Sequence, residues 1–300
     1  MPKPTVTGTH EPPGYFGVPL LRYTGAKWKL ADWIIGQFPP HVLYLEPFCG
    51  SAAIFFRKPK SRIEVLNDAY GTLINFFRVL RERPEALIKQ IQLTPFSRAE
   101  YEAAYEPSAD PLEQARRFYV LSWQSFGAYA GRKSGWRFQK NTGRGTGITR
   151  EWKRTEGLWT SADRLRDAQI ENRDAMEVMR EYDSPTTLHY VDPPYVKSAR
   201  SEGSRSRYMH EMNDKQQHEL AECLHSLEGM VILSGYDCPL YQTLYGDWER
   251  LEKSTVTNGN NTAMESLWLS PNVKKAWQRY DRNEDNKAVE DLPLFAGGDL

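Results

Sequence analysis

Four consecutive residues, Asp192-Pro193-Pro194-Tyr195, place a carboxylate, two rigid prolines and an aromatic ring side by side. They follow Leu188–Val191, an apolar run of the kind that forms a buried strand. Proline fixes the backbone and has no N–H, so the carbonyl oxygens stay available as acceptors. The Asp192 carboxylate and the Pro193 carbonyl could therefore accept both hydrogens of an amino group on a planar ring that stacks on Tyr195. A capped Pro-Pro turn would explain the same residues, so their surroundings must decide.

A second segment that could do chemistry is Glu46-Pro47-Phe48-Cys49-Gly50-Ser51, which leaves a predicted strand. Gly50 allows the backbone to come close to a ligand, as in loops that bind nucleotide cofactors. Ala52 stands where such a loop often has another glycine. The next predicted strand ends at Asp68, whose carboxylate could accept hydrogen bonds from ribose hydroxyls. Capping of the following helix explains Asp68 equally well.

The elements around these residues follow the order strand, glycine turn, helix, strand and acid. This order is typical of one mononucleotide-binding half of a doubly wound α/β sheet. The hydrophobic pattern predicts helices over 27–38, 72–80, 84–93, 97–104, 112–123, 214–227 and 239–244. It predicts strands over 42–45, 63–66, 168–171, 188–191, 230–233, 249–256 and 265–269, the last two as an antiparallel pair that closes the sheet.

This order divides the chain into four parts. A flexible N-terminal arm, rich in Pro, Gly and Thr, occupies residues 1–20. The sheet-forming part, which holds the candidate catalytic residues, comprises residues 21–80 and 166–280. A mainly helical insert, residues 81–165, separates its two halves. The polar residues 281–300 are predicted to be a disordered acidic tail.

The insert ends in a basic, glycine-rich stretch. Residues 132–154 hold eight cations and one acid, Glu151, in a chain whose 39 Lys and Arg balance 39 Asp and Glu. Trp136, Phe138 and Trp152 are interleaved with these cations. Cations that pair with phosphates and rings that stack on bases are features of a DNA-binding element, whereas a flexible solvated loop is the alternative. The candidate DNA-binding residues are Arg132, Lys133, Arg137, Lys140 and Arg144.

The composition limits the class of protein. Nine Trp and sixteen Tyr, with 40% hydrophobic residues, are enough for a packed core, which excludes global disorder. Cys49, Cys223 and Cys238 lack the spacing of a disulfide framework or a zinc cluster, which favours a reducing compartment. Met1–His10 contains no apolar signal core, and no apolar run is long enough to span a membrane. We therefore expect a cytoplasmic protein with no membrane partner.

The order of the short motifs points to a family. Tyr23-x-Gly25-x-Lys27, Glu46-Pro47-Phe48-x-Gly50, Asn67-Asp68, a long insert and Asp192-Pro193-Pro194-Tyr195 follow one another along the chain. This series resembles the Dam-like DNA adenine-N6 methyltransferases, the D12 class or α group. The resemblance implies a Rossmann-like methyltransferase sheet with an inserted target-recognition domain. Two departures from the family pattern are Tyr23, where Trp is common, and Ala52 or Ala53, where a glycine is expected.

The resemblance also implies S-adenosyl-L-methionine as the cofactor and assigns residues to it. Tyr23 and Lys27 would contact the cofactor, Lys27 through the methionine carboxylate or the loop that holds it. Asp68 would bind the ribose. Glu46 to Gly50, including Phe48, would shape the floor of the pocket.

At the tetrad, the resemblance implies that Asp192 touches both the target base and the cofactor, and that Tyr195 stacks on an adenine turned out of the duplex. Pro193 and Pro194 would hold the backbone between them. The expected reaction is in-line methyl transfer to adenine N6 at specific sites in double-stranded DNA, with no metal and no covalent intermediate. Two alternatives stay open: transfer to another amino group, such as cytosine N4 or RNA adenine, and a non-catalytic DNA-binding protein on a decayed methyltransferase scaffold.

The acidic tail contains one apolar island, Asp291-Leu292-Pro293-Leu294-Phe295. Short apolar anchors in disordered tails often dock into grooves of partner proteins. The pentapeptide resembles the motif by which bacterial replication proteins bind the sliding clamp, so a sliding clamp is a candidate partner.

Overall fold

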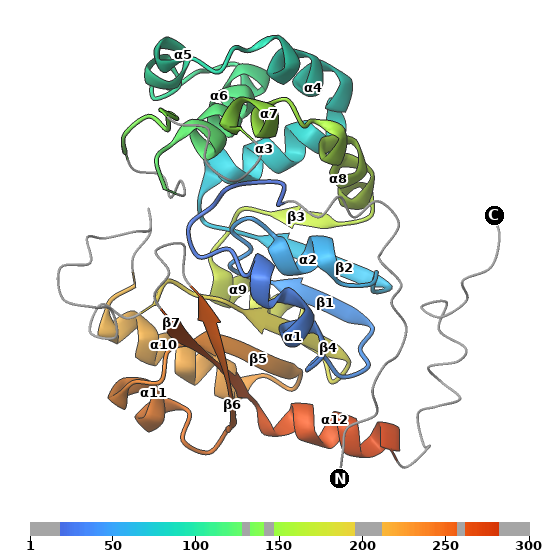
Figure 1. Ribbon diagram of the computed structural model, residues 1–300. Coiled ribbons are helices and arrows are strands. Elements are labelled where there is room, and N and C mark those ends of the chain that lie inside the picture. Colours follow the sequence, from blue (N-terminus) through green and yellow to red (C-terminus); the bar gives the residue numbers. More distant parts are fainter. Residues whose placement is uncertain (1–18, 128–132, 141–146, 196–211, 257–261, 282–300) are drawn as a thin grey trace.

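A seven-stranded sheet runs through the centre of the protein (Figure 1). The computed structural model describes residues 19–127, 133–140, 147–195, 212–256 and 262–281. The strands are β1 (Leu43–Glu46), β2 (Ile63–Asn67), β3 (Gln169–Glu171), β4 (Thr187–Val191), β5 (Met230–Gly235), β6 (Glu249–Val256) and β7 (Thr262–Leu269). Their order is β3-β2-β1-β4-β5-β7-β6. The first five of these strands are parallel, while β7 runs antiparallel to both β5 and β6. The α/β class and the closing antiparallel pair predicted from the sequence are confirmed.

The order of the strands reverses between β1 and β4. β1 pairs with β2 on one side and with β4 on the other, so that Leu45 lies between Val65 and His189. In open α/β sheets, ligands bind outside the carboxyl ends of the strands at such a point. The segments that follow Glu46 and Val191 therefore meet at the edge where a ligand is expected.

Helices cover the sheet on both faces, as the doubly wound class requires. They are η1 (Trp28–Leu30), α1 (Ala31–Ile35), α2 (Ala53–Arg57), α3 (Gly71–Glu82), α4 (Pro84–Leu93), α5 (Arg98–Ala103), α6 (Pro111–Gln124), α7 (Ile148–Trp152), α8 (Glu156–Arg166), α9 (Ala175–Glu181), α10 (Asp214–Ser226), α11 (Pro239–Leu244) and α12 (Pro271–Asp281). Local signals begin several of them. Proline occupies the first position of α4 and α11, and Asn213 forms a capping box with Gln216 at the start of α10.

Alternate residues of the strands feed two hydrophobic clusters. Tyr44 and Leu188 belong to the larger cluster, which also contains α1 and α3. Leu45 and Val231 point to the other face, where they join side chains of α9, α10 and α11. Burial of both faces explains why the parallel strands are apolar almost throughout.

The helices between residues 81 and 165 stack beyond the edge of the sheet formed by β3 (Figure 1). Apolar residues of α4, α6 and α8 belong to the same cluster as α3 and the larger face of the sheet. The helical part and the sheet therefore share one continuous core.

Several expectations differ from the structure or fall outside its described part. The helix expected over 27–38 is a 3₁₀ turn followed by the short helix α1, and α2, α7, α8, α9 and α12 were not predicted. Most of the arm (1–20) and of the tail (281–300), including Asp291–Phe295, lies outside the described residues. Over the part of the chain that is described, no helix combines the length and the apolarity that crossing a bilayer would need.

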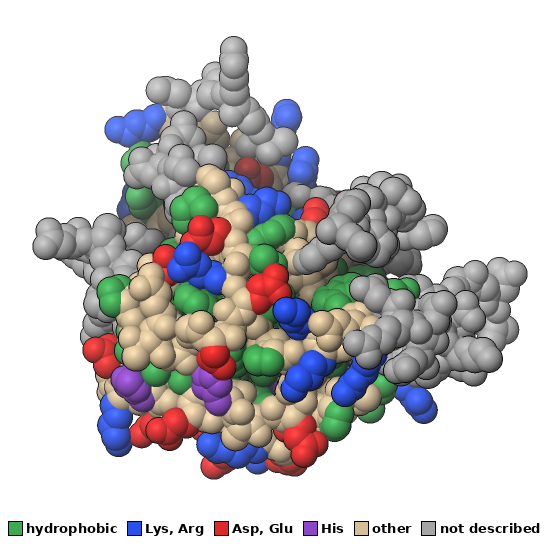
Figure 2. Space-filling view, turned by 90° about the horizontal axis from the view of Figure 1, so that it is seen from below, with side chains coloured by type: hydrophobic (Ala, Val, Ile, Leu, Met, Phe, Trp, Pro, Cys, Tyr) green, Lys and Arg blue, Asp and Glu red, His purple; other side chains and the backbone are tan. Residues whose placement is uncertain are grey.

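The face remote from the helical part, seen from below, carries acidic and basic side chains intermixed (Figure 2). Among the side chains drawn there in colour, neither sign gathers into a large area. A polyanion would find no extended basic surface on that side of the described residues.

Candidate active site

A pocket of about 440 Å³ opens at the carboxyl ends of β1, β2 and β4. This volume lies within the range of small-molecule and cofactor sites. The lining comes from six segments that are far apart in the sequence: the turn before η1, the loop after β1, the end of β2, the start of α9, the segment after β4 and the region of α10. All seven residues expected to bind the cofactor line this one pocket: Tyr23, Lys27, Glu46, Phe48, Gly50, Asp68 and Asp192.

The loop after β1 is held to the end of β2 through Asp68. The backbone N–H of Gly50 donates to Oδ2 of Asp68 at 2.9 Å, and the N–H of Tyr70 donates to Oδ1 at 2.9 Å. The N-cap residue of α3 is Tyr70, so Asp68 does not occupy that position. Asp68 is thus a carboxylate fixed by backbone donors at the end of the second strand, the position from which dinucleotide-binding folds contact a ribose.

Two residues of the loop have left-handed backbone conformations. Gly50 has a φ of 46°, and a Cβ atom built on it would lie 3.4 Å from the ring of Tyr23. Ala52 has a φ of 52° and is the one residue other than glycine with a positive φ among the described residues. The departure from glycine noted in the sequence thus falls on a position where the backbone favours glycine.

Glu46 lies beneath the pocket, 2% exposed. Its Oε1 accepts hydrogen bonds from the hydroxyl of Tyr44 and, at 2.8 Å, from the N–H of Phe55. Burial raises the pKa of Glu46 to about 8, although both hydrogen bonds oppose that shift. At neutral pH this carboxyl group is therefore mainly protonated, and it adds little negative charge to the pocket.

A single buried lysine connects two carboxyl groups beside the tetrad. Nζ of Lys27 donates to the two oxygens of Asp192 at 2.9 and 3.0 Å, and it lies 3.6 Å from Oε1 of Glu265 on β7. Lys27 and Glu265 are less than a tenth exposed, whereas Asp192 is 20% exposed toward the pocket. Burial raises the pKa of Glu265, with Lys27 opposing the shift and Asp192 adding to it.

The tetrad follows β4 as the sequence predicts, and its members differ in position. Asp192 and Pro194 line the pocket. Tyr195 is 5% exposed, donates its hydroxyl hydrogen to Glu265, and lies edge-on to Tyr236 with ring centroids 4.7 Å apart. The carbonyl of Pro194 accepts a hydrogen bond from the side chain of Gln217 at 3.0 Å. This bond ties the tetrad to α10.

The pocket also has walls that the sequence did not point to. Asp174, which follows β3, caps α9 by accepting from the N–H groups of Met176 and Glu177. An acid after a parallel strand is the same signal that singled out Asp68, and it could have identified Asp174. Gln216 and Glu219 reach the pocket from α10, but their polar helix pattern does not distinguish them from a solvated face.

Three of the five candidate DNA-binding residues are described. Lys133 and Lys140 are exposed, and their ammonium groups lie over the rings of Tyr105 and Phe138. Arg137 is less available because it donates to Glu151 at 2.8 Å. Arg132 and Arg144 lie outside the described residues.

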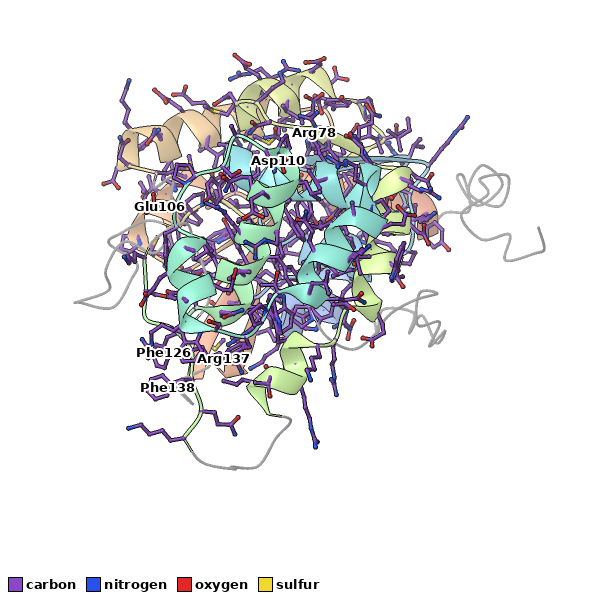
Figure 3. The ribbon with its side chains drawn as sticks, turned by 90° about the horizontal axis from the view of Figure 1, so that it is seen from above. Arg78, Glu106, Asp110, Phe126, Arg137 and Phe138 are labelled. Atoms are coloured by element: carbon purple, nitrogen blue, oxygen red, sulfur yellow. The ribbon has the colours of Figure 1, made fainter. Side chains whose placement is uncertain are left out.

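The strand-like segments on either side of residues 128–132 lie against each other. The N–H of Phe126 donates to the carbonyl of Gly135 at 2.6 Å, and the N–H of Arg137 donates to that of Gln124 at 2.7 Å. Phe126 and Phe138 are 72% and 53% exposed. Figure 3 shows both rings at one edge of the helical part, next to Arg137. Exposed rings and cations therefore share one edge of the molecule.

Comparison with known proteins agrees with this geometry. Residues 23–258 match the D12 class N6 adenine-specific DNA methyltransferase family. The chain is also 26% identical over 270 residues to the Type II methyltransferase M1.LlaDCHI of Lactococcus lactis subsp. cremoris, a match that covers 80% of this chain and 89% of that protein. The family match runs from Tyr23 through the pocket loop, the helical part and the tetrad. The chain belongs to the D12 class N6 adenine-specific DNA methyltransferase family, as the order of its motifs predicted.

Proposed function

We propose that this DNA adenine methyltransferase uses S-adenosyl-L-methionine to methylate N6 of an adenine that has been turned out of duplex DNA at specific sites. The family supports methylation of adenine in DNA, and it favours adenine N6 over the other amino groups considered. One observation carries the finer proposal. The residues expected for the cofactor and the acid of the tetrad surround a single pocket at the switch point of the sheet.

The pocket has donors and acceptors that suit the cofactor. Asp68 offers a fixed carboxylate for ribose hydroxyls, and Gly50 lets the backbone approach a ligand. The carboxyl groups of Asp192 and Glu265 both lie beside the single ammonium of Lys27. This excess of carboxyl groups over cations favours a cationic ligand. When bound, the cofactor supplies a methyl group activated by a positively charged sulfur.

The tetrad residues act on the amino group that receives the methyl. The lone pair of adenine N6 is delocalised into the ring, so N6 is a weak nucleophile. Hydrogen bonds from N6 to the Asp192 carboxylate and the Pro193 carbonyl favour tetrahedral nitrogen and stabilise the positive charge that develops there. Once methylated, N6 would have to release one proton, first to the Asp192 carboxylate that it contacts and then to water. By holding N6 in one orientation toward the methyl group, the two acceptors would supply a further part of the rate.

Turning the adenine out of the duplex costs about a few kcal/mol. We assign the contacts that offset this cost to the edge that carries Lys133, Lys140, Phe126 and Phe138. The two cations are exposed where they can pair with phosphates, and exposed aromatic rings are suited to stacking on bases.

The test of the reaction begins with expression in a host that lacks DNA methylation, followed by mapping of N6-methyladenine by long-read sequencing. The wild-type chain should methylate adenine in a defined sequence context. Asp192→Ala should lower transfer by at least about 100-fold and leave DNA affinity within a few-fold. Asp167→Asn, which removes an exposed carboxylate, is the matched control. Near-normal turnover by Asp192→Ala would overturn the role of the tetrad.

The test of the DNA edge is the dependence of affinity on salt. Lys133→Ala and Lys140→Ala should each reduce the slope of log affinity against log salt by about 1, because each removes one phosphate contact. Arg137→Ala should change the slope less, since Arg137 already pairs with Glu151. Lys89→Ala on α4 serves as the control with another exposed lysine. Slopes that stay unchanged in Lys133→Ala, Lys140→Ala and Arg137→Ala, as in the Lys89→Ala control, would place the DNA elsewhere.

A further inference from the structure

Glu265 is a buried carboxyl group beside the tetrad, and it lies beyond the residues that match the family. It comes from β7, whose antiparallel pairing with β5 brings it next to the end of β4. Its Oε1 accepts the hydroxyl hydrogen of Tyr195 and lies 3.6 Å from Nζ of Lys27. A buried carboxyl group that contacts two residues of a reaction site needs an explanation beyond packing.

Lys27 occupies the place that the target amino group is expected to take. Its ammonium donates to both oxygens of Asp192, at 2.9 and 3.0 Å, and lies 4.7 Å from the centre of the Tyr195 ring. Hydrogen bonding to Asp192 is the interaction proposed above for the amino group, and contact with the face of Tyr195 is the one that the family resemblance implies for the adenine ring. The ammonium therefore stands in for the amino group, and the base and Lys27 compete for one place.

Nζ of Lys27 also donates to the carbonyl of Gly25 at 3.2 Å, but a neutral carbonyl does not balance a buried positive charge. Release of Asp192 is therefore favourable only where another anion is close. Glu265 supplies that anion within a short movement of a flexible side chain. When Lys27 pairs with Glu265 instead, its ammonium no longer neutralises the carboxylate of Asp192. That carboxylate can then stabilise the positive charge that develops on N6.

We propose that Glu265 is a positioning residue that receives Lys27 when the target amino group binds Asp192, and that also fixes the ring of Tyr195 through its hydroxyl. The inference rests on the proposed transfer to adenine N6. It predicts that Glu265 governs the rate of the chemical step rather than the affinity for cofactor or DNA.

Glu265→Gln is the first test, because the amide keeps an acceptor oxygen for Tyr195 while it removes the charge. The single-turnover rate at saturating S-adenosyl-L-methionine and DNA should fall on the order of 10- to 100-fold, with both dissociation constants within about threefold of wild type. Glu252→Gln on the neighbouring strand β6 removes an exposed carboxylate and should retain the wild-type rate. A Glu265→Gln rate within twofold of wild type would overturn the inference.

Glu265→Asp distinguishes charge from packing. Asp keeps the carboxylate but is shorter, whereas Gln matches the size of Glu without its charge. If Glu265 pairs with Lys27, Glu265→Asp should retain more of the rate than Glu265→Gln. A purely structural role predicts the reverse order, and thermal unfolding of both variants measures the packing loss separately.

Tyr195→Phe separates the two contacts of Glu265. In a Tyr195→Phe background, Glu265→Gln should still slow the single-turnover rate by about tenfold, because the effect on Lys27 remains. A cost that disappears in this background would mean that Glu265 acts through Tyr195 alone, and the proposed transfer of Lys27 would be wrong. A wild-type chain that transfers no methyl group to adenine would instead contradict the proposed function, and the inference with it.

Discussion

Two buried charge clusters lie toward opposite ends of the sheet and use the same residue types differently. At the carboxyl end, Lys27 lies between Asp192 and Glu265. Toward the amino end, Glu64 on β2 lies between Lys58 and Arg164. The first cluster has one cation for two carboxyl groups, and the second has one carboxylate for two cations.

The cluster toward the amino end is closely bonded. Nζ of Lys58 donates to Glu64 at 2.5 Å, to Ser61 at 2.8 Å and to the carbonyl of Pro59 at 2.7 Å, while Arg164 donates to both oxygens of Glu64. Burial by itself would raise the pKa of Glu64, but the hydrogen bonds and charges of Arg164 and Lys58 hold it below its ordinary value. This cluster fastens α8 to the sheet.

The pocket cluster is bonded less closely, since Lys27 is 3.6 Å from Glu265 and in contact with Asp192. A cation with two carboxyl groups within reach can change partner, whereas a carboxylate held by two cations cannot release either without leaving a buried charge. The comparison teaches that the number of oppositely charged partners for each charge, more than the residue types, distinguishes the proposed reaction site from a cluster that stabilises the fold.

The largest expected effect comes from removing Glu64, the shared carboxylate of the cluster toward the amino end. Glu64→Ala leaves Lys58 and Arg164 without their shared carboxylate, so the free energy of unfolding should fall by about 4 kcal/mol. Urea unfolding followed by circular dichroism measures this change. Glu82→Ala, which removes an exposed carboxylate on α3, should stay within about 0.5 kcal/mol of wild type. A loss below about 1 kcal/mol in Glu64→Ala would make the two clusters energetically alike.

Replacing the lysine of each cluster compares how much each lysine contributes to the free energy of unfolding. Lys27→Met leaves Asp192 and Glu265 as neighbouring carboxyl groups and should lower the free energy of unfolding by about 2 kcal/mol at pH 7. Lys58→Met should cost about 1 kcal/mol or less, because Arg164 still pairs with Glu64 and burial already lowers the pKa of Lys58 to about 8. Equal losses in the two variants would contradict the difference in pairing.

Rising pH should also change the free energy of unfolding in opposite directions through Glu46, at the pocket end, and Lys58, toward the amino end. Because the pKa of Glu46 is raised from 4.5 to about 8 in the folded state, the free energy of unfolding should fall as the pH rises toward 8, by on the order of 2 kcal/mol between pH 6 and 8. The pKa of Lys58 is instead lowered, so its loss of a proton above about pH 8 relieves the folded state and raises stability.

Single variants test the two contributions, and each charge also acts on the pKa of the other group. Glu46→Gln should remove the loss of stability between pH 6 and 8, and Lys58→Met should remove the gain above pH 8. Urea unfolding at four pH values over this range gives both slopes. If neither substitution changes the slope, the two buried groups do not titrate as described.

The smallest expected effect concerns backbone strain at Ala52, in the loop after β1. Ala52→Gly relieves the left-handed φ of 52° but gives the unfolded chain more freedom, so its stability should stay within about 0.5 kcal/mol of wild type. Ala53→Gly, at the first residue of α2, relieves no left-handed backbone and should cost up to about 1 kcal/mol. Equal costs in urea unfolding would argue against strain at Ala52.

The sequence predicted elements well where the signal is local. Strand β6 and the helices α4 and α11 have their predicted bounds, and proline marks the first residue of both helices. Helix α2 escaped prediction because it has five residues and starts from a left-handed residue with no capping side chain. Helix α8 escaped because Thr155 before it makes no side-chain cap and the preceding stretch is rich in glycine.

The residues of the candidate site also divide into those that the sequence marks by a local motif and those that it does not. Lys27, Asp68 and Asp192 stand in recognisable motifs at the ends of predicted elements, so the motif order brought them into one hypothesis. Glu265 had no such signal, because it lies within a strand and meets Lys27 only through the pairing of β7 with β5. Residues that act through long-range strand pairing stay hidden until the order of the strands is known.

Among the described strands, the half of the sheet formed by β3, β2 and β1 joins the half formed by β4, β5, β7 and β6 through the parallel pairing of β1 with β4, in which Leu45 and His189 are register partners. The last described helix returns to the first, since Trp277 on α12 donates a hydrogen bond to the carbonyl of Gln37 at 3.4 Å. A circularly permuted gene, opened between α6 and α7 and joined from α12 to the segment ahead of Tyr23, would keep the order of the described strands and every described segment that lines the pocket. The order in which the motifs are encoded is therefore a matter of gene layout, which evolution or an engineer can rearrange without redesign of the reaction site.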